Sequence, residues 1–90
     1  MKPRTMIIKM SKFGILLNSR STAREDYLRM LQIADGSTEI ILDFGGVEIL
    51  TPSYADELFH SLAERYGTSN IKAIHQETSL VKDTVKAVAG

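Results

Sequence analysis

The chain has 90 residues, of which 43% are hydrophobic and 24% charged, and its 11 basic and 11 acidic residues give zero net charge. This length predicts a single domain over residues 1–90. The absence of cysteine excludes disulfides, thiolate metal sites and thiol catalysis. Balanced charge argues against nucleic-acid binding, and the sequence lacks both an apolar run of about 18 residues and a secretory signal. We therefore expect a cytoplasmic protein.

Two short apolar segments open the chain. Met6–Met10 and Phe13–Leu17 are predicted to be strands, and Gly14 marks a bulge in the second. Ser11-Lys12 between them has the length of a tight hairpin turn. The two strands are therefore expected to pair antiparallel.

A first helix is predicted over Ala23–Ala34. Thr22 and Glu25 have the spacing of a capping box at its start, and Gly36 suits its end. Its apolar residues follow a helical period and define one packed face: Ala23, Tyr27, Met30, Leu31 and Ala34. The opposite, polar face is predicted to carry Arg24, Asp26 and Arg29.

The segment Ile40–Phe59 is the most informative part of the chain. Its first three residues are continuously apolar, which is typical of a strand covered on both faces. A turn with two glycines follows, and a second helix is predicted over Pro52–Tyr66, with Thr51 as N-cap and Gly67 as the stop. Asp56 and Glu57 come early enough to interact favourably with the positive end of the helix dipole.

The remaining elements are a strand over Ile71–Ile74 and a helix over about Leu80–Val88, with Ser79 as its cap. The predicted order is ββαβαβα, in which helices connect parallel strands. This order predicts an α/β fold with a four-stranded mixed sheet and three helices.

The chemically capable residues do not form a recognisable catalytic or metal motif. His60 and His75 lack further ligands at zinc spacing, so we predict surface histidines, no metal and no cofactor. Asp43 with Glu48, Asp56 or Glu57 could act as an acid–base pair, but each acid also has a role in folding. Four residues separate Gly45-Gly46 from the helix, unlike a phosphate-binding loop. We predict that the chain is not an enzyme.

Two hydroxyl groups stand at the start of the second predicted helix. Thr51 and Ser53 lie where the helix dipole and free amides favour an added phosphate, which carries about 1.5 to 2 negative charges. Helix capping without modification explains the same residues. Both explanations stay open on this evidence.

The segment Leu42–Val47 followed by Pro52–Phe59 resembles the core of the STAS-like domains of unassigned function, which are related to anti-sigma-factor antagonists. The resemblance extends from about residue 13 to residue 88 and implies a STAS-like fold. It also implies binding to a serine kinase with a histidine-kinase-like ATPase fold. The family's Asp-Ser-Ser-Gly phosphorylation pattern falls on residues 51–54, where Pro52 occupies the acceptor position and Ser53 the neighbouring one.

These observations predict a regulatory protein-interaction module that binds an anti-sigma-type ATPase. Its predicted phosphorylation sites are Ser53 first and Thr51 second. The predicted partner-binding residues lie on the glycine turn and the start of the second helix: Gly45, Gly46, Glu48, Thr51, Ser53, Tyr54, Asp56 and Glu57. Alternatives are a sensory module for nucleotides or small apolar molecules, a small enzyme using the acids above, a nucleic-acid binder and a homo-oligomeric scaffold.

Overall fold

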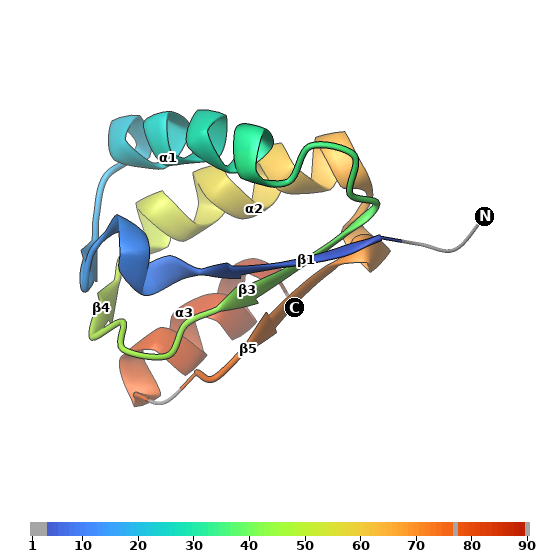
Figure 1. The fold of residues 1–90 in the computed structure, drawn as a ribbon. Coiled ribbons are helices and arrows are strands. Elements are labelled where there is room, and N and C mark those ends of the chain that lie inside the picture. The colour runs from blue at the N-terminus through green and yellow to red at the C-terminus, as the bar shows by residue number, and fades with distance from the viewer. Residues whose placement is uncertain (1–3, 77, 90) are drawn as a thin grey trace.

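The computed structural model describes residues 4–76 and 78–89 (Figure 1). Its helices are α1 (Arg20–Ile33), α2 (Pro52–Tyr66) and α3 (Ser79–Ala89). Its strands are β1 (Thr5–Lys9), β2 (Leu16–Leu17), β3 (Glu39–Asp43), β4 (Ile49–Leu50) and β5 (Ile71–Ile74). Short 3-10 helices cover Met10–Phe13 and Thr68–Asn70. None of the helices in these ranges combines the length and apolar character needed to cross a membrane.

The strands form two parallel sheets, and the predicted single four-stranded mixed sheet is wrong. The larger sheet has the order β1-β3-β5, and the smaller one pairs β2 with β4. Every strand pairing within the described ranges is parallel. The short strand β4 was not predicted, because it has two residues and follows the glycine turn directly.

The predicted N-terminal hairpin is replaced by a 3-10 helix. Met10 is fully buried there, and the amide of Gly14 donates to the carbonyl of Ser11 at 3.2 Å. Gly14 has a φ of 135°, a backbone conformation that side chains disfavour, and it redirects the chain away from β1. The following strand, β2, therefore joins β4 and does not pair with β1.

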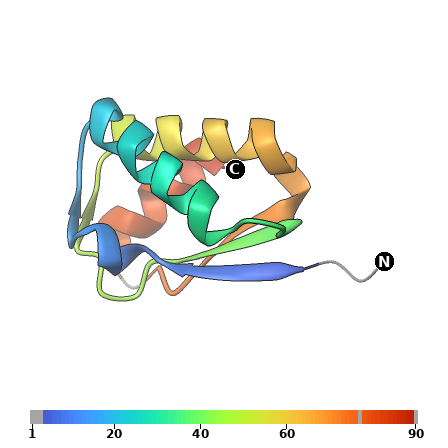
Figure 2. The same cartoon turned by 45° about the horizontal axis from the view of Figure 1, so that its top comes forward.

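Helices α1 and α2 lie over the same face of the larger sheet (Figures 1 and 2), and α3 packs against α2 and β4. The hydrophobic core of the domain includes Ile8, Ile40 and Leu42 of this sheet, which are buried. The opposite face carries the exposed Ile7 and the half-buried Ile41. The prediction that the central strand is covered on both faces is therefore wrong, and the sheet is packed on one face.

The helix boundaries show which local signals were decisive. The bounds of α2 agree with the prediction, with Thr51 as N-cap and Gly67 after its last residue. Helix α1 begins earlier than predicted because Ser19 Oγ accepts from the amide of Thr22 at 3.2 Å, so the predicted capping box does not form the cap. Helix α3 is capped by Thr78, whose Oγ1 accepts from the amide of Val81 at 3.1 Å.

Candidate functional site

The glycine turn between β3 and β4 presents two residues of the predicted partner-binding set. Gly46 and Glu48 are exposed, and Gly45 is half-buried. Val47 between them is buried, and its amide donates to the carbonyl of Phe44 at 3.0 Å. Gly46 has a φ of 85°, which explains the need for glycine at this corner.

The pairing of β2 with β4 creates an apolar surface next to this turn. Leu16 lies opposite Ile49 and Leu17 opposite Leu50, so alternate side chains point inward and outward. Leu17 and Leu50 are buried, whereas Leu16 is 59% exposed and Ile49 44% exposed. The carbonyl of the exposed Ile15 accepts from the amides of Glu48 and Ile49. We call these four exposed neighbours the β2–β4 surface: Ile15, Leu16, Glu48 and Ile49.

The start of α2 adjoins the β2–β4 surface, and the two phosphorylation candidates there differ in their exposure to solvent. Ser53 is exposed on the first turn of the helix. Thr51 is half-buried, and its Oγ1 lies 3.4 Å from both the amide of Tyr54 and the carbonyl of Leu17. Modification of Thr51 would disrupt these contacts, whereas Ser53 is accessible without any change in the fold.

Tyr54 does not belong to an exposed surface, contrary to the prediction. Its side chain is fully buried, and its hydroxyl group donates to Oδ2 of Asp26 at 2.8 Å. Burial, followed by the Asp26 carboxyl, raises the pKa of Tyr54. Asp26 is also buried, so the prediction that it lies on the polar face of the first helix is wrong. It comes three residues after Ala23 and four before Met30, a spacing that places it on the packed stripe.

Asp56 and Glu57 form ion pairs with α1. Arg20 Nη1 lies 2.8 Å from Asp56 Oδ2 and 3.9 Å from Glu57 Oε1, and Arg24 Nε lies 3.6 Å from Glu57 Oε1. The first turn of α2 contains no acid, so the predicted interaction with the helix dipole is wrong. The acids instead link the surfaces of α1 and α2, where solvent weakens such pairs.

Asp43 and His75 form a pair that the sequence reasoning missed. Asp43 Oδ1 accepts from the amide of Gly45 at 2.9 Å and contacts Nδ1 of His75 at 2.8 Å. The Gly45 amide and then His75 lower the pKa of Asp43. The available signal was topological: Asp43 ends β3 and His75 follows β5, and these strands are parallel neighbours. Their carboxyl ends therefore meet at one edge of the sheet.

The predicted alternative of a carboxylate pair for catalysis is not assembled by these contacts. Asp43 contacts Gly45 and His75, whereas Asp56 and Glu57 contact the arginines of α1. Within residues 4–76 and 78–89, His, Asp and Glu side chains do not gather in groups of three that could hold a metal ion. His60 is exposed on α2 and pairs with Glu64, one turn further along the helix.

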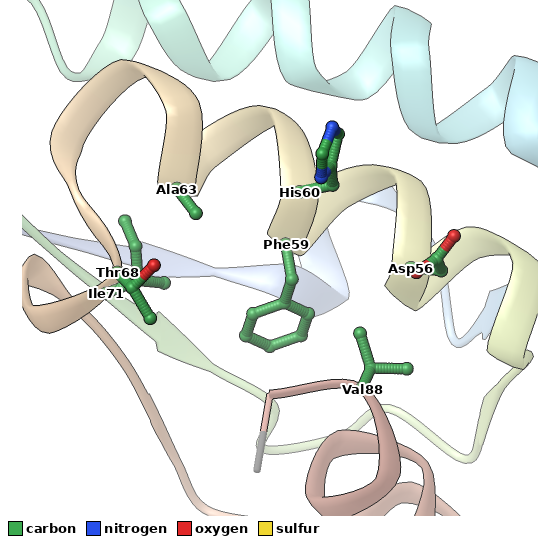
Figure 3. Close-up of a pocket in the computed structure, with 7 residues that line it drawn as sticks. All are labelled: Asp56, Phe59, His60, Ala63, Thr68, Ile71 and Val88. Atoms are coloured by element: carbon green, nitrogen blue, oxygen red, sulfur yellow. The ribbon is translucent and has the colours of Figure 1, made fainter.

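A shallow groove lies beside α2, between that helix, β5 and α3 (Figure 3). The ring of Phe59 lies between Ile71 and Val88, while the side chain of His60 points away from that ring. The volume of the groove is about 230 Å³. Pockets for drug-sized ligands usually enclose about 300 to 1,000 Å³, so this groove accommodates a smaller group.

The amino-acid sequence of the domain matches a known protein family. A family model described as "STAS-like domain of unknown function (DUF4325)" matches residues 27–84, which is more than half of the chain. The matched region includes β3, β4, α2 and β5. Searches of curated proteins and of solved structures found no significant match. The chain therefore belongs to this family of STAS-like domains and has a STAS-like α/β fold with three helices and parallel strands.

Proposed function

We propose that this domain is a non-enzymatic regulatory module that binds a protein partner through the β2–β4 surface and the exposed start of α2. The observation that carries the proposal is the pairing of Leu16 with Ile49, which places two exposed apolar side chains next to each other. Protein interfaces commonly have such an apolar centre with a polar rim. Glu48 precedes Ile49 directly and Ser53 follows it by four residues, and both are exposed polar residues.

The position of this apolar cluster distinguishes it from ordinary exposed side chains. Single exposed apolar residues are normal on protein surfaces, whereas contiguous ones mark interaction sites. The other exposed large apolar residues lie on separate elements: Ile7 on β1, Leu28 and Ile33 on α1, and Leu80 on α3. In the β2–β4 surface, backbone pairing keeps Leu16 and Ile49 together.

The proposed partner is an ATPase with a histidine-kinase-like fold. Membership in a STAS-like family and the resemblance to anti-sigma-factor antagonists support this class of partner. Ser53 is the proposed regulatory residue, since it is exposed in the first turn of α2, the helix that follows β4. A phosphate there would add about 1.5 to 2 negative charges to the rim, which would weaken binding to a partner surface that packs closely against it.

Retention of the purified domain on immobilised histidine-kinase-like ATPase domains tests this proposal. We expect retention of the wild type and loss of it for Leu16→Asp and Ile49→Asp. Leu28→Asp and Ile33→Asp on α1 are matched controls, because their exposed fractions are close to those of the test residues. Leu28 is 61% exposed against 59% for Leu16, and Ile33 and Ile49 are both 44% exposed. Equal retention of Leu16→Asp and Leu28→Asp would contradict the proposed surface, and a wild-type domain that none of the ATPases retains would contradict the partner class.

The groove beside Phe59 supports a second candidate function, binding of a small ligand or a nucleotide. Its lining combines apolar residues (Phe59, Ala63, Ile71 and Val88) with polar ones (Asp56, His60 and Thr68). Its volume of about 230 Å³ favours a compact group over a whole nucleotide. Thermal stabilisation by a small ligand that is abolished in Val88→Asp, together with failure to bind any ATPase, would favour this candidate over the first.

A further inference from the structure

The pair formed by Asp43 and His75 lies at the carboxyl-terminal edge of the larger sheet, on β3 and directly after β5. The amide of Phe44 donates to the carbonyl of Ile74 at 2.9 Å, which holds the two chain segments together beyond the last strand residues. Open α/β sheets place ligand and catalytic groups at this edge. The pair shares no residue with the β2–β4 surface and has no role in the function proposed above.

The contact with Asp43 determines which nitrogen of His75 carries a proton. An ionised carboxylate accepts hydrogen bonds and cannot donate them, and the lowered pKa of Asp43 keeps it ionised at neutral pH. Nδ1 of His75 must therefore be the donor in the 2.8 Å contact. In the neutral imidazole, the unshared electron pair then lies on Nε2, which points away from Asp43.

The backbone of His75 is strained in a way that favours a functional role. Its φ is 56°, in the left-handed region that residues other than glycine seldom adopt. Such conformations are strained and concentrate at functional sites. Here the conformation accompanies the contact of the ring with Asp43, while 62% of the side chain stays exposed to solvent.

We propose that Nε2 of His75 is a phosphoryl-acceptor site. A histidine oriented by a carboxylate at Nδ1 is a suitable nucleophile, because the carboxylate stabilises the positive charge that develops on the ring. Phosphoryl transfer suits an isolated exposed nucleophile, since catalysis of it consists mostly of positioning and charge stabilisation that the donor's enzyme can supply. Acyl transfer would in addition require an oxyanion hole beside the acceptor.

The donor class is a nucleoside triphosphate held by another protein. The electron pair of Nε2 forms the new bond to the γ-phosphorus as the bond from that phosphorus to the bridging oxygen breaks. The nucleoside diphosphate leaves with the electrons of the broken bond. Nδ1 keeps its hydrogen, and the positively charged ring faces the carboxylate of Asp43.

His60 is a control for this chemistry within the same chain. Its side chain is 70% exposed and also contacts a carboxylate, but through Nε2, at 3.1 Å from Oε1 of Glu64. Glu64 is itself 72% exposed, whereas Asp43 is 14% exposed and is held by the amide of Gly45. The two histidines thus have similar access to solvent and differ in which nitrogen is occupied and in how firmly the carboxylate is held.

Reaction of the wild-type protein with phosphoramidate, which donates a phosphoryl group and releases ammonia, tests the proposal. The rates at the two histidines are read by mass spectrometry of tryptic peptides, because Ala73–Lys82 contains His75 and Met30–Arg65 contains His60. Phosphorus NMR identifies the modified nitrogen. We expect His75 to react at Nε2 roughly ten times faster than His60, and Asp43→Asn to slow His75 roughly tenfold without affecting His60.

Three results would overturn the proposal: equal or slower reaction of His75 relative to His60, attachment of the phosphoryl group to Nδ1 of His75, or an unchanged rate in Asp43→Asn. The comparison of the two histidines requires no substitution, so a variant that misfolds does not obscure it. Binding to an ATPase through the β2–β4 surface is measured independently, and failure of either proposal leaves the other unaffected.

Discussion

The hydroxyl group of Tyr54 on α2 donates a 2.8 Å hydrogen bond to Asp26 on α1, and both side chains are buried. The exposed ion pair of Arg20 with Asp56 joins the same two helices at the surface. A buried bond depends less on salt and solvent than an exposed ion pair does. The position of the α2 start, and therefore of Ser53, is thus fixed mainly from inside the domain.

Replacing Tyr54 by phenylalanine should destabilise the domain by about 1 to 3 kcal/mol, because the carboxyl group of Asp26 is left buried without its partner. Urea denaturation followed by circular dichroism measures the change. Tyr27→Phe, at a half-buried tyrosine on α1, is the control and should change stability by less than about 0.5 kcal/mol. The double variant Asp26→Leu/Tyr54→Phe should recover part of the loss, since both polar groups are then removed. Equal stability of Tyr54→Phe and Tyr27→Phe would show that the buried bond is unimportant.

Replacing Arg20 by alanine should cost less than about 1 kcal/mol, because Arg20 and Asp56 are each about half exposed. The effect should shrink further in about 1 M salt, where the screening length is near 3 Å. Denaturation of Arg20→Ala, Asp56→Ala and the double variant gives the coupling energy. A coupling above about 2 kcal/mol that persists in high salt would contradict the assignment of these pairs as weak surface interactions.

The pair at the sheet edge should make stability sensitive to acid. The pKa of Asp43 is lowered in the folded state, so its stabilising contribution is fully present above the ordinary aspartate value of about 3.9. This stabilising contribution is lost as the pH falls below about 3.9 and then through the lowered pKa of Asp43. The stability difference between wild type and Asp43→Asn should therefore be present at pH 5 and diminish below pH 4. A difference that is unchanged at pH 3 would contradict the lowered pKa.

Replacing Ser53 by aspartate should stabilise the isolated domain by about 0.3 to 1 kcal/mol, because the negative charge lies in the first turn of α2, near the positive end of its dipole. Thermal denaturation at low ionic strength measures this gain. Ser61→Asp is the control on the same helix: it places the charge beyond the first turns and four residues after Glu57, so it should not stabilise. Destabilisation by Ser53→Asp would contradict the position of Ser53 at an accessible helix start.

The sequence was most informative where several local signals coincide. The bounds of α2 agree with the prediction because Thr51, Pro52 and Gly67 each have a distinct conformational preference that favours a helix end there. The N-terminal region had a weaker signal, since Ser11-Lys12 has no turn-specific residue. Burial of Met10 and the positive φ of Gly14 accompany the 3-10 helix there, and the pairing of β2 with β4 joins segments distant in sequence.

The exposure of the candidate residues was predictable only in part. Gly46, Glu48 and Ser53 are exposed where the pattern placed them, whereas Tyr54 is buried because its hydroxyl group finds a partner in Asp26. Contacts between distant segments, such as Asp43 with His75, require the order in which the strands lie side by side, and the prediction of parallel strands joined by helices did not specify that order. The apolar pairing of Leu16 with Ile49 likewise depended on β4.

Isothermal titration calorimetry of the domain with a histidine-kinase-like ATPase that retains it tests the proposed function most directly. The proposal predicts that Leu16→Asp raises the dissociation constant at least about tenfold, as expected when a charge enters the apolar centre of an interface. Leu28→Asp, at nearly the same exposure on α1, should leave the constant within about twofold of wild type. Equal dissociation constants for the two variants would contradict binding through the β2–β4 surface.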